Sequence, residues 1–239
     1  MACAGAGQFG ARLRRGGGIR VPAPPREEGD LGNVVEERVR HLRIAVGVMG
    51  SAGGAMNEKA IAMATEMGKA IATRGCVLVT GACPGLPHYA VKGAKSAGGI
   101  VVGISPALNF EEHSMKYRSP YGGYDVLIYT GSGLMGREIE NIRSCDLVVF
   151  MGGRSGTLGE FAIAYDEGKV IGILQGTGGI ADKMEIIVGL IEKQTGAQIV
   201  YSREPVDLLD RLLAVYQEKL MPYYKTILAN SHPDGKPED

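Results

Sequence analysis

The chain has 239 residues, 45% of them hydrophobic, and its 26 basic and 26 acidic side chains give a formal charge of zero. This length allows one sizeable hydrophobic core, and the balanced charge excludes a global field that would draw the protein to nucleic acid or to a membrane surface. No apolar stretch reaches the ~20 residues of a membrane span, and the four cysteines lack metal-ligand spacing. We therefore expect a cytoplasmic protein with no metal site and no membrane or nucleic-acid partner.

The N-terminal segment has a composition of its own. Residues 1–33 are rich in Gly, Ala, Arg and Pro and have almost no periodic apolar pattern. Such a segment cannot bury enough apolar surface to offset the entropy that ordering costs, so we predict a disordered extension over residues 1–40. Its arginines, with no acidic residue before Glu27, also faintly resemble a transit peptide. One domain is expected over residues 41–222, followed by a solvated tail over residues 223–239.

From Arg43 onward, short apolar runs rich in Val and Ile alternate with helical patterns. The runs are continuously apolar, which indicates strands buried on both faces of a sheet. In the first helical segment, the apolar residues share one face, and Gly75 is expected to end the helix. Strands that alternate with helices pair in parallel, so the predicted fold is α/β: a doubly wound, Rossmann-like, mostly parallel sheet of about seven strands in a single domain. The predicted strands are residues 43–49, 76–80, 100–105, 125–130, 147–151, 170–174 and 198–202, and the later helices are residues 88–97, 134–144, 157–168, 181–194 and 205–220.

Glycine-rich turns follow four of the predicted strands. They read GSAGG (50–54), GACPGLP (81–87), GSGLMGRE (131–138) and GGRSGTLGE (152–160). In such sheets ligands bind beyond the carboxyl ends of the strands, and the helix N-termini that follow present free N–H groups to anions. Purely structural turns are the alternative, but four on one edge favour a phosphorylated ligand.

The turns do not match the common nucleotide-binding motifs. The first reads GxxGxxG instead of GxGxxG, and the second strand ends at Val79-Thr80 without the acidic residue that binds a ribose in dinucleotide sites. No GxxxxGK[ST] motif is present. These observations argue against a hydride-transferring NAD enzyme and against a P-loop nucleotidase.

Four features together resemble the LONELY GUY (LOG) family over about residues 43–220. They are the Gly-Ser after the first strand, the Gly-Leu of the second turn, an arginine before the fifth strand and the GG..GT..E pattern after that strand. The family motif PGGxGTxxE is similar to MGGRSGTLGE at residues 151–160. The resemblance implies a phosphoribohydrolase that cleaves the N-glycosidic bond of a nucleoside 5′-monophosphate, AMP or cytokinin-type, to free base and ribose 5-phosphate. It also implies that no cofactor is needed and that the protein is a homodimer, with residues 181–194 as one candidate interface helix.

The chain also departs from the LOG pattern. Met151 replaces the motif proline, and Arg154-Ser155 stands where the motif has one residue. The second turn matches the family only at Gly81, Gly85 and Leu86. These features look closer to a sister branch of Rossmann-like nucleotide-binding proteins that includes molybdenum-cofactor carriers and relatives of the DNA-processing DprA proteins. The alternative function is therefore a non-catalytic nucleotide or molybdenum-cofactor binding protein that uses the same phosphate site.

The resemblance assigns catalytic roles to Arg137 and Glu160. A carboxylate at Glu160 would stabilise the oxocarbenium-like state of glycosidic cleavage and position water, and Arg137 would bind the phosphate or orient the glutamate. Backbone N–H and hydroxyl groups of the glycine-rich turns would bind the phosphate. The predicted phosphate-binding residues are Gly50, Ser51, Gly81, Gly85, Gly152, Gly153, Arg154, Ser155, Gly156 and Thr157.

Three local features have simpler interpretations. Thr157 and Glu160 form a capping-box pattern, in which Thr157 caps a helix and Glu160 folds back to it. Glu138 could face the ligand, but an acidic residue in the first turns of a helix is expected on a solvated face. The connection over residues 109–125 has the length of a lid, and its tyrosines could stack on a nucleobase or lie on the surface.

Overall fold

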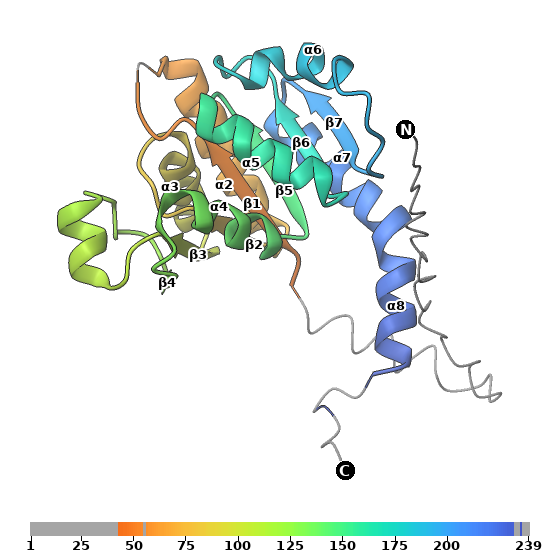
Figure 1. Cartoon of the computed structure of the whole chain (residues 1–239), viewed down its shortest axis with the longest axis horizontal. Helices are drawn as coiled ribbons and strands as arrows, with labels where there is room; N and C mark the ends of the chain where they lie inside the picture. The colour runs from red at the N-terminus through yellow and green to blue at the C-terminus, as the bar shows by residue number, and fades with distance from the viewer. Residues whose placement is uncertain (1–42, 55, 232–234, 236–239) are drawn as a thin grey trace, which may run out of the picture.

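The computed structural model describes residues 43–54, 56–231 and 235, so the extension predicted for residues 1–40 lies outside the described residues. Seven strands form one parallel sheet in the order β4-β3-β2-β1-β5-β6-β7. The doubly wound, Rossmann-like single domain predicted from the sequence is confirmed (Figure 1). The strands are β1 (Ala45–Gly50), β2 (Val77–Thr80), β3 (Ile100–Ser105), β4 (Val126–Tyr129), β5 (Leu147–Met151), β6 (Val170–Leu174) and β7 (Gln198–Ser202).

Helices cover both faces of this sheet. α2, α3 and α7 pack on one face, and α4, α5 and α6 pack on the other (Figure 1). Alternate residues of the central strand β5 pack into the hydrophobic clusters on opposite faces of the sheet. Val149 and Met151 belong to the cluster under α2, α3 and α7, and Val148 and Phe150 belong to the cluster under α4, α5 and α6. Within the described part of the chain, no helix is long and apolar enough to cross a membrane. The helices are α2 (Glu58–Thr73), α3 (Leu86–Ser96), α4 (Gly133–Arg143), α5 (Ser155–Asp166), α6 (Met184–Gly189), α7 (Pro205–Val215) and α8 (Met221–Ala229).

The ends of α2 follow from local sequence. Asn57 caps its N-terminus, since its side-chain oxygen accepts a hydrogen bond of 2.7 Å from the backbone N–H of Ala60. The helix ends just before Gly75, whose φ of 70° lets the chain turn into β2. The predicted stop at Gly75 is confirmed.

Two predicted boundaries differ from the structure. The helix expected over residues 181–194 is wrong beyond α6, which ends at Gly189; glycine weakens a helix, and residues 191–197 run without helix or strand to β7. The domain boundary expected at residue 222 falls inside α8, which continues to Ala229. Met221 and Tyr224 pack against the core, so the start of α8 is held by the domain.

The predicted lid connection contains a short π-helix, Glu112–Lys116, which is anchored by a buried histidine. His113 donates from Nε2 to the carbonyl of Pro120 (3.1 Å), so its Nδ1 is left to accept from the hydroxyl of Ser105 (2.8 Å). The tyrosines of this connection, Tyr117, Tyr121 and Tyr124, are not among the residues that line the cavity described below. This segment is therefore fastened to the end of β3 and does not contribute a stacking platform to that cavity.

Candidate functional site

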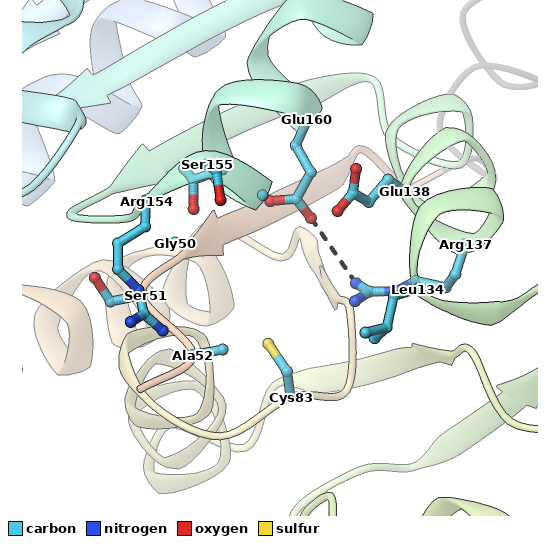
Figure 2. A pocket seen from close by; sticks show the side chains of 12 residues that line it. Gly50, Ser51, Ala52, Cys83, Leu134, Arg137, Glu138, Arg154, Ser155 and Glu160 are labelled. Carbon is cyan, nitrogen blue, oxygen red and sulfur yellow. Dashed lines mark ion pairs between the residues drawn. The ribbon is translucent and has the colours of Figure 1, made fainter. Parts of the chain in front are cut away.

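A cavity of about 320 Å³ lies at the carboxyl ends of β1 and β5 (Figure 2). The strand order reverses between these two strands, which is the place where doubly wound sheets bind ligands. The volume lies near the lower end of the usual range for small-molecule sites, roughly 300–1,000 Å³. The lining residues are Gly50, Ser51, Ala52, Cys83, Leu134, Arg137, Glu138, Arg154, Ser155, Gly156, Thr157 and Glu160.

Most of the predicted site residues meet in this cavity. The predicted residues that do not line it are Gly81, Gly85, Gly152 and Gly153. Four lining residues are missing from the predicted set: Ala52, Cys83, Leu134 and Glu138. Each of the four belongs to one of the glycine-rich segments that follow the strands, so their position in those segments could have predicted that they line the site. Burial raises the pKa of Cys83 to about 11, so its thiol stays protonated at neutral pH.

The amides of Gly152 and Gly153 are already engaged within the protein. The N–H of Gly152 donates to the hydroxyl oxygen of Thr177 (2.9 Å), and that of Gly153 donates to the hydroxyl oxygen of Ser51 (2.6 Å). Their carbonyls accept from the amides of Ala181 and Ile180. The two glycines therefore shape the turn, and any backbone donors to a phosphate must come from the residues that follow.

Those donors are the first amides of α5. The helix begins at Ser155, with Arg154 at the N-cap and no side-chain capping bond, so the prediction that Thr157 is the N-cap is wrong. Gly153, at a φ of 93°, reverses the chain early enough for the helix to start two residues sooner. Among the described residues, nothing accepts from the N–H groups of Ser155, Gly156 and Thr157. Free amides at a helix N-terminus form an anion site.

Arg137 and Glu160 face each other across the cavity. The Nη1 atom of Arg137 lies 3.8 Å from Oε1 of Glu160, and the two side chains are only 8% and 10% exposed. The Nε atom of Arg137 is buried without a hydrogen-bond partner among the described residues. Three effects set the pKa of Glu160: burial raises it most, the charge of Arg137 lowers it, and the charge of Glu138 raises it. The net result is a pKa of about 7. Glu160 thus pairs with Arg137 instead of folding back to a cap (Figure 2).

Glu138 also lies in the cavity, and its predicted place on a solvated face is wrong. The residue is 7% exposed, and its carboxylate points towards that of Glu160 (Figure 2). The reason is tertiary: α5 presents Gly156 and Gly159 to α4, so no side chain of α5 at these positions keeps Glu138 out. Burial raises the pKa of Glu138, while Arg137 lowers it.

The raised pKa of Glu160 predicts a pH-dependent stability. Between about pH 4.5 and pH 7 the folded chain holds a proton on Glu160 that the unfolded chain releases, so the free energy of unfolding falls as the pH rises through this window. The effect is at most about 3 kcal/mol. Thermal unfolding measured from pH 4.5 to pH 8 should show this decline in the wild type and a shallower one in Glu160→Gln. Equal slopes for the two chains would contradict the buried, proton-holding state of Glu160.

A family model for the SLOG cluster4 family matches residues 43–209, which include every strand and the whole cavity. The chain belongs to the SLOG cluster4 family. A relative of this SLOG cluster4 protein, an uncharacterized protein of Archaeoglobus fulgidus, is 34% identical over 130 residues, which are 54% of this chain and 79% of that one.

Solved structures similar to this SLOG cluster4 protein include two that are named for molybdenum cofactor. The molybdenum cofactor binding protein of Rippkaea orientalis is 28% identical, with a TM-score of 0.61 over 73% of this chain and 98% of that one. The molybdenum cofactor carrier protein of Chlamydomonas reinhardtii is 31% identical, with a TM-score of 0.57 over 72% and 99%. DNA processing protein A of Helicobacter pylori, at 14% identity and a TM-score of 0.52 over 76% and 84%, shares the fold. The predicted relationship to the branch of Rossmann-like proteins that includes the molybdenum-cofactor carriers is confirmed.

Proposed function

We propose that this SLOG cluster4 protein binds a phosphorylated pterin ligand of the molybdenum-cofactor type. The observation that carries the proposal is the anion site at the start of α5, where three amides without partners among the described residues face a cavity that also contains Arg154 and Arg137. The ligand class is supported by the similarity to two proteins named for this cofactor, over nearly their whole lengths.

Phosphate would bind at the amides of residues 155–157. The hydroxyl of Ser51 accepts from Gly153, and no described residue accepts its hydrogen, which can therefore be donated to a phosphate oxygen. Arg154 extends along the cavity next to Ser51, and no hydrogen bond or ion pair joins its side chain to another described residue (Figure 2). A guanidinium can pair bidentately with phosphate, so Arg154 supplies the charge that the amides lack.

The test is whether the ligand copurifies. The full chain should be produced in cells that make molybdenum cofactor, and its molybdenum and its oxidised, fluorescent pterin should be measured after purification. We expect both to accompany the wild-type chain and to fall several-fold in Arg154→Glu. The matched control is Arg203→Glu, an exposed arginine outside the cavity. Wild-type protein with no more molybdenum or pterin than Arg154→Glu would contradict the proposal.

The second candidate is the phosphoribohydrolase expected from the LOG resemblance, and the Arg137–Glu160 pair is the observation that favours it. In that reaction the C1′–N bond of the nucleotide breaks with its electrons going to the base nitrogen, water adds its oxygen to C1′, and the proton that the water loses ends on that nitrogen, so the products are the free base and ribose 5-phosphate. The Glu160 carboxylate would oppose the positive charge that builds up on the sugar. Since burial raises the pKa of Glu160 to about 7, turnover should increase as the pH rises through 7. Release of adenine from AMP that Glu160→Gln abolishes would favour this candidate over a binding protein.

We further propose a homodimer whose interface is an apolar surface of α4 and β4. Met135 and Ile139 of α4 are 75% and 40% exposed. Val126 and Ile128 of β4 pair in register with Val102 and Ile104, which face the same side of the sheet as α4. A two-fold axis would pair this surface with itself. This α4–β4 surface has more exposed apolar side chains than α6, which belongs to the segment 181–194 that the sequence suggested as an interface.

The dimer proposal is tested by mass in solution. Met135→Glu is expected to shift the chain from dimer to monomer in sedimentation or light-scattering measurements, because it places a charge in an apolar contact. Leu190→Glu, at a residue that is 77% exposed and directly follows α6, is the matched control and should leave the dimer intact. Dissociation by Leu190→Glu alone would return the interface to residues 181–194.

A further inference from the structure

Glu138 lies on α4 and lines the cavity. The residue is 7% exposed, and among the described residues it makes no hydrogen bond and no ion pair. The nearby guanidinium of Arg137 is directed to Glu160 (Figure 2). The cavity therefore holds two carboxylates and one guanidinium at this end, and the Glu138 oxygens are open to the cavity, where a donor group of a ligand can reach them.

The carboxylate of Glu138 lies beside the anion site. A Cβ atom built on Gly156 would be 3.5 Å from Oε1 of Glu138, and one built on Gly159 would be 3.3 Å from Oε2. Gly156 carries one of the three amides proposed to bind phosphate. A phosphate at those amides adds negative charge close to Glu138, so a ligand that also supplies a hydrogen-bond donor there is strongly preferred to one that does not.

We infer that Glu138 is a specificity-determining residue whose carboxylate accepts a hydrogen bond from a hydroxyl or amino group that the ligand carries near its phosphate. The inference rests on the proposed function, because it requires a phosphate at the start of α5. It makes the site selective: phosphorylated ligands with a donor at this position bind, and closely related ligands without it are discriminated against. Sugar hydroxyls and the amino group of a pterin or purine are the two sources of such a donor.

Matched ligand pairs separate these two sources. Binding of AMP, 2′-deoxy-AMP and 3′-deoxy-AMP to the full chain, measured by calorimetry, tests the sugar hydroxyls. Binding of GMP and IMP, which differ by one amino group, tests the base. A hydrogen bond to a charged group predicts that the wild type loses roughly 10- to 100-fold in affinity within at least one of these comparisons.

Variants of Glu138 should reduce, in a graded way, the ratio of the affinities for the two ligands of such a pair. Glu138→Gln keeps a neutral acceptor and should retain part of the discrimination, while Glu138→Ala should bring the ratio close to one. Affinity for inorganic phosphate should not fall in either variant. Glu140→Ala, an exposed glutamate on the same helix, is the control and should keep the wild-type ratio.

The outcomes distinguish this inference from the proposed function. A wild-type chain that binds inorganic phosphate but binds both members of every pair equally would overturn the role of Glu138, even if no variant could be folded. Wild-type ratios preserved in Glu138→Ala would overturn it as well. A wild-type chain that binds neither inorganic phosphate nor any nucleotide would contradict the phosphate site itself.

Discussion

Gly68→Ala is expected to lower the free energy of unfolding by about 3 kcal/mol, because it overpacks a contact that has no room for a methyl group. Gly68 lies on α2, and a Cβ atom there would be 1.8 Å from the carbonyl oxygen of Ala90 on α3. The reciprocal contact is as close, with a Cβ on Gly93 of α3 only 1.9 Å from the carbonyl oxygen of Thr65. The neighbours are backbone atoms, so relief requires the two helices to separate.

Chemical denaturation of the wild type and the variant measures this loss. Gly189→Ala is the matched control, since no atom of the described residues outside its own helix and chain neighbours lies within 4 Å of a Cβ there, and alanine favours a helix. The control should be neutral or slightly more stable than the wild type. If Gly68→Ala unfolded at the same denaturant concentration as Gly189→Ala, α2 and α3 would not be in direct backbone contact.

Gly81→Ala is expected to remove Arg137 from the cavity without changing Arg137 itself. A Cβ atom on Gly81 would be 1.6 Å from Nη1 and 2.6 Å from Cζ of Arg137, so the guanidinium must move. Gly81 does not line the cavity. The LOG resemblance assigns phosphate binding to Arg137, and on that assignment phosphate or AMP affinity should fall roughly 10- to 100-fold, as in Arg137→Ala, because a charged hydrogen-bond partner of the ligand is lost.

The double variant makes this prediction specific. If both substitutions act by removing the same guanidinium, Gly81→Ala adds almost nothing in an Arg137→Ala background, whereas independent effects would add. A second measurement does not depend on any ligand. Because Arg137 lowers the pKa of Glu160, displacing it should raise that pKa further, which NMR titration of the Glu160 carboxyl would detect. Additive losses together with an unchanged Glu160 titration would contradict the contact between Gly81 and Arg137.

The positions of Arg137 and Glu160 could be predicted from the sequence, but their relationship could not. The resemblance to the LOG motif places both residues near the same sheet edge, and the structure brings them within 3.8 Å. The motif could not show that Nε of Arg137 has no partner among the described residues or that burial raises the pKa of Glu160 to about 7. Those properties depend on how completely α4 and α5 exclude water, and their roles with a ligand stay predictions.

The helix start at Ser155 shows why local patterns misled. Thr157 and Glu160 have capping-box spacing, and that spacing alone favours a helix that starts at Thr157. The turn before it is instead held by Ser51, which is 102 residues away in the sequence, and by Thr177 from the loop after β6. These contacts occupy the amides of Gly152 and Gly153 and leave those of Ser155, Gly156 and Thr157 available.

The sequence by itself determined the strands, their parallel pairing and the sheet edge on which the candidate site lies, because continuous apolar runs and the glycine turns after them are local properties of the chain. Only the tertiary structure decided what each side chain at that edge does. Glu138 has the local signature of an exposed acidic residue at a helix start, yet Gly156 and Gly159 on the facing helix admit its carboxylate into the cavity. Burial and charge pairing depend on the neighbours that the fold supplies, and no spacing within one segment specifies them.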